Sequence, residues 1–267
     1  MAITSGVTPH PASADVDHDW LRVERIGPAA VVVFDRPQRR NSLSPPQARG
    51  LTALLEEIGT DPSISGVVLT GNGAFCAGGD MKAIVPIIKE GTDALRTVVY
   101  GAFQRLMRTL VQLPVPLVAA VDGAAVGFGF DLALACDCRF IGPQGWLQQG
   151  WAVGGAIPAT GGVLFLDRIR PDLLWRLLDG QHHIDGPQAE KLGLGEATTG
   201  PAVDAAVLRV TSFAQMPRTT LRRYVDLARS DLRDRLESYL PVALDHQVAC
   251  LTSTEFMAFT DRFRAQA

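Results

Sequence analysis

Short apolar runs alternate with segments of helical periodicity through the first half of the chain. The segment from Val31 to Phe34 is apolar at every position, which is typical of a strand covered on both faces. Residues 67–69 and 117–121 are likewise apolar throughout. We expect strands over residues 21–24, 29–34, 67–69, 117–121 and 139–141. Apolar residues at helical spacing predict helices over residues 45–58, 94–112 and 127–135. The repeated order of strand, loop and helix predicts an α/β fold.

The chain beyond Pro158 has an almost entirely helical pattern. Amphipathic periods occupy residues 187–192, 203–215, 220–227 and 233–263. No linker divides the chain cleanly, but its character changes along its length. We therefore expect a flexible tail over residues 1–19, an α/β core over 20–200 and a C-terminal helical region over 201–267 that serves assembly.

Composition and charge exclude several classes of protein. Hydrophobic residues make up 47% and charged residues 20% of the 267 positions, close to the values of globular proteins and far from those of disordered chains. The net charge of −3 disfavours a nucleic-acid partner. The first 19 residues lack the basic and apolar regions of a signal peptide, and no uninterrupted run of about 18 apolar residues predicts a membrane span.

The cysteines and histidines indicate neither a disulfide framework nor a metal site. Cys136 and Cys138 lack zinc-ligand spacing, and the other two cysteines, Cys76 and Cys250, lie far away in the sequence. The five histidines show no ligand spacing either. We therefore expect reduced thiols, a cytoplasmic location and no bound metal.

Common nucleotide and hydrolase motifs are absent. The segment that begins Gly71-Asn72-Gly73 follows a strand, but Cys76 stands where a dinucleotide-binding motif has its third glycine. The sequence contains neither a phosphate-binding Gly-Lys-Ser/Thr nor a Gly-x-Ser-x-Gly elbow. A nicotinamide-dependent oxidoreductase is therefore disfavoured.

Two Gly-rich turns carry the chemical signal that remains. They span residues 74–80 and 122–129, and each follows a buried strand and precedes a helix. Such turns leave backbone N–H groups free, and two that converge can form an oxyanion hole. For either turn alone, close packing between a strand and a helix is an alternative explanation.

Four motifs occur together in an order and spacing that resemble the enoyl-CoA hydratase/isomerase (crotonase) family. They are Asn41-Ser42-Leu43-Ser44, the turn 74–80 with Lys82, the turn 123–129, and Ile157-Pro158-Ala159-Thr160-Gly161-Gly162. The resemblance covers about residues 21–199. It implies a spiral of ββα units, a homotrimer or a dimer of trimers, and an acyl-CoA substrate with no separate cofactor.

The resemblance also implies roles for individual residues. The oxyanion donors fall on the backbone N–H groups of Gly79 and Phe128, and Asp131 is the candidate proton-transfer group. The positions implied to meet the substrate, including the CoA phosphates, are Arg36, Arg39, Arg40, Ala77, Lys82, Gly127 and Trp151. For Arg39 and Arg40, a solvated turn is an equal alternative.

The chain departs from the family at the two glutamates that its hydratases use. Asp131 replaces the first, and Trp151, which cannot transfer a proton, replaces the second. Asp131 is either catalytic, with a pKa raised by apolar neighbours, or a carboxylate that stabilises a helix terminus. Trp151 suits the wall of a pocket for an aromatic or bulky acyl group.

We therefore expect an acyl-CoA enzyme that stabilises a thioester enolate with one proton-transfer carboxylate. Isomerase-like or lyase-like chemistry is favoured over two-glutamate hydration. The alternatives are a decarboxylase or a carbon–carbon bond enzyme of the same family, and a catalytically weak acyl-CoA-binding subunit.

Overall fold

A seven-stranded mixed sheet forms the centre of the computed structural model, which describes residues 8–9, 19–178 and 182–265. Its order is β1-β2-β3-β4-β5-β7-β10; β1, β2 and β3 pair antiparallel, and β3 to β10 pair parallel. The strands are β1 (Thr8–Pro9), β2 (Leu21–Ile26), β3 (Ala29–Phe34), β4 (Gly66–Gly71), β5 (Leu117–Val121), β7 (Cys138–Ile141) and β10 (Glu196–Ala197). Most of the predicted tail over residues 1–19 lies outside the described residues.

A second, smaller sheet supports the predicted turns. It contains β6 (Ala124–Val126), β8 (Trp146–Gln148) and β9 (Ile184–Asp185), with β8 in the middle. The parallel pairing of β6 with β8 places the second Gly-rich turn beside the segment that leads to Trp151.

Helices surround both sheets. In chain order they are α1 (Pro45–Thr60), α2 (Met81–Glu90), α3 (Thr92–Ala94), α4 (Gly101–Gln112), α5 (Phe128–Leu134), α6 (Gly162–Ile169), α7 (Leu173–Leu177), α8 (Gly186–Leu192), α9 (Ala202–Phe213), α10 (Arg218–Leu251) and α11 (Thr254–Ala265). A π-helical segment, η3 (Leu95–Tyr100), joins α3 to α4, and short 3-10 turns occupy η2 (Pro37–Arg39) and η4 (Ala152–Gly154).

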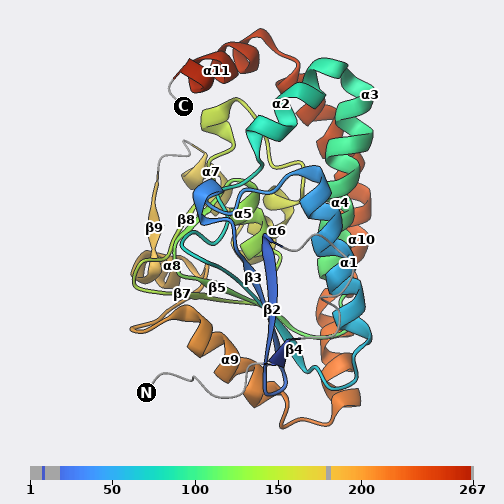
Figure 1. Ribbon diagram of the computed structural model, residues 1–267, viewed down its shortest axis with the longest axis vertical. Coiled ribbons are helices and arrows are strands. Elements are labelled where there is room, and N and C mark those ends of the chain that lie inside the picture. Colours follow the sequence, from blue (N-terminus) through green and yellow to red (C-terminus); the bar gives the residue numbers. More distant parts are fainter. Residues whose placement is uncertain (1–7, 10–18, 179–181, 266–267) are drawn as a thin grey trace.

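The large sheet is covered on both faces, which explains why its central strands are apolar at every position. Ala202, Ala206 and Val210 of α9 pack with Val31 and Val68 on one face. On the other side, α1, α4 and α10 lie next to one another, as Figure 1 shows. The predicted boundary at residue 200 stays a prediction, and α9 beyond it packs directly on the sheet.

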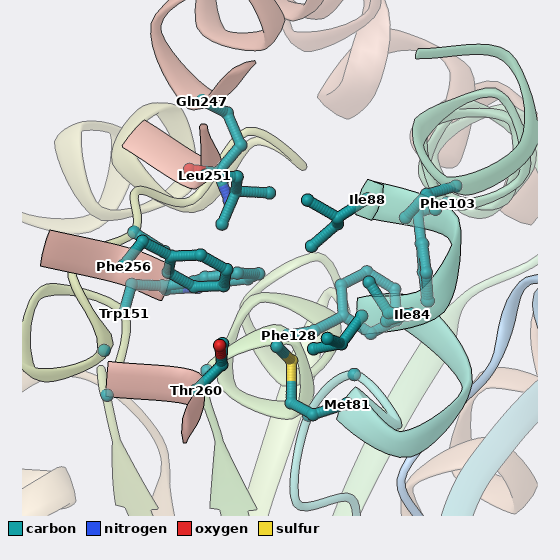
Figure 2. A pocket seen from close by; sticks show the side chains of 18 of the residues that line it. Met81, Ile84, Ile88, Phe103, Phe128, Trp151, Gln247, Leu251, Phe256 and Thr260 are labelled. Carbon is teal, nitrogen blue, oxygen red and sulfur yellow. The ribbon is translucent and has the colours of Figure 1, made fainter. Parts of the chain in front are cut away.

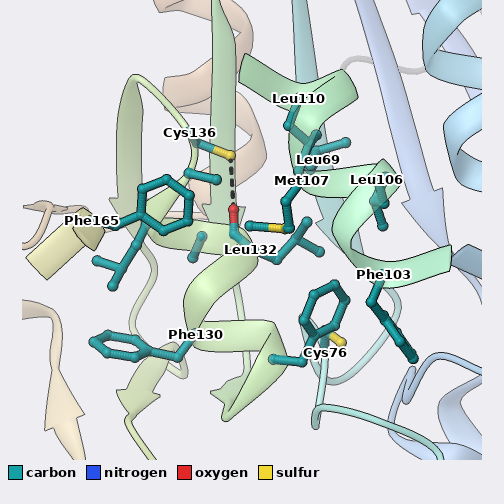
Figure 3. Packing of buried hydrophobic residues seen from close by; sticks show 14 of the residues in the cluster. Leu69, Cys76, Phe103, Leu106, Met107, Leu110, Phe130, Leu132, Cys136 and Phe165 are labelled. Carbon is teal, nitrogen blue, oxygen red and sulfur yellow. Dashed lines mark hydrogen bonds between the residues drawn. The ribbon is translucent and has the colours of Figure 1, made fainter. Parts of the chain in front are cut away.

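Helix α5 is buried along its whole length, so its apolar sequence is the expected one. Figure 3 shows Phe130 and Leu132 of α5 between Met107 of α4 and Phe165 of α6. The thiol of Cys136 donates to the Leu132 carbonyl oxygen at 3.4 Å, at the C-terminal end of this helix. Because α5 is buried along its length, the Asp131 carboxyl is held away from bulk water.

The long helix α10 is tied to the core by Arg229, which is buried. Its guanidinium donates to the carbonyl oxygens of Leu110, Leu113 and Val115 and forms an ion pair with Asp137. The cation is therefore fully hydrogen-bonded, as a buried charge requires.

Several predicted boundaries in the helical parts were wrong. The segments 220–227 and 233–263 were predicted as separate helices, but α10 runs unbroken from Arg218 to Leu251 with Pro241 inside it, and α11 follows. No helix was predicted over Met81–Glu90, where Pro86 interrupts an otherwise clear apolar pattern. The short strands β6, β8, β9 and β10 were also missed because two or three residues carry no detectable period. Among the described residues, no helix is both long and apolar enough for a membrane crossing.

Candidate active site

The two Gly-rich turns are joined by backbone hydrogen bonds. The Cys76 N–H donates to the Ala124 carbonyl oxygen, and the Val126 N–H donates to the Cys76 carbonyl oxygen, both at 3.0 Å. A Cβ atom on Gly129 would lie 1.9 Å from the Cys76 carbonyl oxygen, and one on Gly123 would lie 2.0 Å from the carbonyl oxygen of Gly73, which immediately precedes the first turn. Glycine at these positions therefore permits the close approach of the two turns.

This pairing places two free N–H groups at one cavity. Gly78 (φ 102°) and Gly127 (φ 56°) adopt positive φ values, which glycine tolerates readily. The residues that follow them, Gly79 and Phe128, line the cavity. The Cβ position of Gly78 would lie only 3.7 Å from the Phe128 nitrogen. Neither the Gly79 N–H nor the Phe128 N–H donates to another described residue. The two N–H groups can therefore both donate hydrogen bonds to one anionic oxygen.

The cavity has a volume of about 300 Å³ and is mainly apolar. Figure 2 shows side chains from α2, α4, α5, α10 and α11 pointing into the same space. Its labelled lining residues are Met81, Ile84, Ile88, Phe103, Phe128, Trp151, Gln247, Leu251, Phe256 and Thr260. No carboxylate lies among the lining residues in the described part of the chain.

Asp131 lies behind the cavity wall and connects to it through Thr160. Its side chain is 1% exposed, and Thr160 Oγ1 donates to Asp131 Oδ2 at 2.6 Å. Thr160 lines the cavity, whereas Asp131 does not. Burial raises the pKa of Asp131 to about 7, although the hydrogen bond from Thr160 and the indole N–H of Trp151 both lower it. At neutral pH the carboxyl is thus divided between its charged and neutral forms.

Trp151 lines the cavity next to this carboxyl. Its Nε1 atom is buried and forms no hydrogen bond of normal geometry with a described residue. The indole is nevertheless close enough to Asp131 to lower the pKa of that carboxyl. Residues 131 and 151 therefore contribute one carboxyl and one aromatic N–H near the cavity, and not two carboxylates.

The predicted basic residues have different surroundings. Lys82 is exposed and lines the cavity. Arg36 contacts Gln47 Oε1 at 2.8 Å and Asp80 at 3.5 Å, so its guanidinium is engaged within the chain. Arg39 and Arg40 do not line the cavity, but the Arg40 carbonyl oxygen accepts from the N–H of Ala77, a lining residue, at 2.9 Å. The role of these basic residues in binding phosphates stays a prediction. Gly127 lines the cavity, and its predicted contact with the substrate stays a prediction as well.

Sequence reasoning missed several groups at this cavity. Thr160 lies inside a motif that was noted only for its glycines and proline. Tyr100 and Gln247 both line the cavity, yet they are far apart in the sequence, and no local pattern connects them. The apolar wall from α11, including Phe256 and Phe259, also had no sequence signal.

Comparison with known proteins identifies the family of the chain. The sequence profile of the enoyl-CoA hydratase/isomerase family matches residues 26–262. The chain belongs to this family. The probable enoyl-CoA hydratase EchA14 of Mycobacterium tuberculosis is 30% identical over 243 residues, which cover 86% of this chain and 91% of that protein. (E)-benzylidenesuccinyl-CoA hydratase of Thauera aromatica is 30% identical over 190 residues, which cover 70% of this chain and 71% of that protein.

Solved structures show the same fold. The crystal structure of an enoyl-CoA hydratase/isomerase from Mycobacterium paratuberculosis has a TM-score of 0.84 at 22% identity and covers 92% of this chain and 98% of its own. The structure of Pseudomonas aeruginosa OdaA has a TM-score of 0.81 at 26% identity, and the match covers 92% of this chain and 99% of that chain. The crotonase-like α/β fold predicted from the sequence is confirmed.

The raised pKa of Asp131 predicts a pH-dependent cost in stability. Between pH 4 and pH 7 the folded state binds more protons than the unfolded state, because the pKa rises from 3.8 to about 7 on folding. The wild type should therefore lose stability relative to Asp131→Asn as the pH rises through this range, by about 4 kcal/mol in total. Urea unfolding at successive pH values measures the difference.

Asp167→Asn, at a half-exposed ion pair with Arg235, is the matched control for this experiment. A stability difference between wild type and Asp131→Asn that does not change with pH would contradict the raised pKa.

Proposed function

We propose that the protein is an acyl-CoA thioester enzyme that forms an enolate in this cavity. The observation that carries the proposal is the pair of free N–H groups at Gly79 and Phe128 on an apolar cavity, with one buried carboxyl connected to the same wall. The thioester oxygen binds between the two N–H groups, and each donor lowers the barrier by about 3 kcal/mol as negative charge develops.

Asp131 holds the proton that the reaction moves. A proton leaves a carbon next to the thioester and reaches Thr160 Oγ1 while the Thr160 proton passes to Asp131 Oδ2, and the electron pair moves onto the thioester oxygen. Return of the proton to a different carbon shifts a double bond. The 2.6 Å hydrogen bond between Thr160 and Asp131 supports this route, and a pKa of about 7 suits both directions of transfer.

This arrangement favours isomerase-like or lyase-like chemistry over two-carboxylate hydration. No carboxylate of the described chain lines the cavity, and Trp151 has no transferable proton. Decarboxylation or carbon–carbon bond chemistry would use the same hole. The name of the (E)-benzylidenesuccinyl-CoA hydratase indicates a substrate with an aromatic ring, which supports a bulky acyl group against the aromatic wall here.

The CoA part enters with the substrate, and no separate cofactor is proposed. The exposed ammonium of Lys82 at the cavity is the best-placed group to meet its phosphates. Arg40, which follows Arg39, is joined to the turn 74–80 by the hydrogen bond from the Ala77 N–H to its carbonyl oxygen. Arg36 is held by Gln47 and Asp80.

Deuterium exchange tests this proposal. Saturated, enoyl, aryl and malonyl-type CoA thioesters incubated in D₂O should gain deuterium or change mass with the wild type. Asp131→Asn should slow the reaction at least ~100-fold while thioesters still bind. Thr160→Val should also slow it, and Thr160→Ser should restore it because the hydroxyl returns.

Asp167→Asn serves again as the control and should react like the wild type. Binding of the thioesters by the wild type without exchange or mass change would favour the binding-subunit alternative instead.

We also propose a homotrimer or a dimer of trimers. Large apolar side chains are exposed on the outer helices: Leu208 is 70%, Tyr224 65% and Leu227 74% exposed. Light scattering on the eluting protein should give three or six times the chain mass of 28.6 kDa. A mass equal to one chain would contradict the assembly.

A further inference from the structure

A buried polar pair interrupts the apolar wall of the cavity. Tyr100, at the end of the π-helical segment η3, is 4% exposed, and Gln247 of α10 is fully buried. Gln247 Nε2 lies 2.6 Å from the Tyr100 hydroxyl, and both residues line the cavity. Irregular π-helical turns are frequent at functional sites, where they redirect a side chain.

The hydrogen-bond pattern determines which group of the pair donates. The Ile157 N–H donates to Gln247 Oε1 at 2.8 Å, and a backbone N–H can only donate, so this amide oxygen is fixed as an acceptor. Gln247 must then present its NH₂ group to Tyr100. The Tyr100 oxygen therefore accepts in this contact, and its own proton has to point elsewhere.

No described residue accepts the Tyr100 proton. Burial raises the pKa of Tyr100 above its ordinary value, so the group stays a neutral O–H donor at every working pH. A buried donor without an acceptor is unfavourable, and a ligand oxygen in the cavity would remove that cost. Thr260 of α11 also lines the cavity, but its hydroxyl proton is already donated to the Met257 carbonyl oxygen.

The acceptor should be neutral. The negative charge of Asp131 contributes to the raised pKa of Tyr100, so a second anion near this hydroxyl would be repelled. The cation on the cavity wall, Lys82, is exposed to solvent, so it cannot offset the desolvation of a carboxylate deep in the apolar part.

We propose that Tyr100, oriented by Gln247, is a specificity-determining residue that donates to a neutral oxygen on the acyl group, such as a ketone, hydroxyl or ether remote from the thioester. This inference rests on the proposed function and specifies its substrate class as oxygenated, bulky acyl-CoA thioesters. The aromatic and aliphatic walls bind the hydrocarbon part, and the Tyr100 hydroxyl selects the oxygen.

An oxygen scan tests the assignment. Octanoyl-CoA is compared with 5-oxo-, 6-oxo- and 7-oxo-octanoyl-CoA, and 3-phenylpropanoyl-CoA with its 4-methoxyphenyl analogue, by calorimetric titration. For at least one pair, the wild type should bind the oxygenated member about 10-fold more tightly, equal to about 1.4 kcal/mol. Tyr100→Phe should abolish this preference and leave the affinity for the oxygen-free member within about twofold.

Tyr224→Phe, at a tyrosine that does not line the cavity, is the matched control and should keep the preference. The ratio of two affinities for one protein does not change when a variant is merely less stable, and the scan on the wild type needs no variant. An equal affinity for both members of every pair, or a preference that survives in Tyr100→Phe, would overturn the inference alone. Failure of every thioester to bind would overturn the proposed function as well.

Discussion

The two backbone hydrogen bonds between Cys76 and the strand β6 are the constraint on which the site depends. They bring the ends of two parallel strands, β4 and β5, into contact through the turns that follow them. Only glycine permits this approach at Gly123 and Gly129, and only glycine readily adopts the φ values of Gly78 and Gly127. The N–H groups that remain unpaired are the consequence of this packing, so the structural and chemical explanations of the turns are the same.

The surroundings of α5 determine what the site can do with a proton. The helix is buried on all sides, so Asp131 loses hydration and its pKa rises to about 7. Thr160 partly compensates by donating a hydrogen bond and also reaches the cavity. The carboxyl is therefore neither a solvated capping group nor in direct contact with the cavity. The Thr160 hydroxyl lies between the carboxyl and the cavity, and in the mechanism that we propose it connects the one proton-transfer group to the substrate.

Several central strands could be predicted from the sequence, because the apolar runs that indicate them are local. The apolar runs at 29–34 and 117–121 predicted strands correctly. Gly79 and Phe128 were implied only by the resemblance of the motifs to the crotonase family. Tyr100 and Gln247 could not be found this way, because 147 residues separate them and their contact depends on how α10 packs against η3. Likewise, the depth of Asp131 behind Thr160 results from tertiary packing, which a single sequence does not display.

The polarisation of a bound thioester carbonyl tests the central claim most directly. An acyl-CoA labelled with ¹³C at the thioester carbon can be observed by difference infrared spectroscopy, free and bound to Asp131→Asn, which prevents turnover and leaves both turns intact. We expect a lower carbonyl stretching frequency on binding, because two N–H groups draw charge onto the oxygen. A bound thioester whose carbonyl frequency equals that in water would show that the oxygen does not lie between the N–H groups of Gly79 and Phe128.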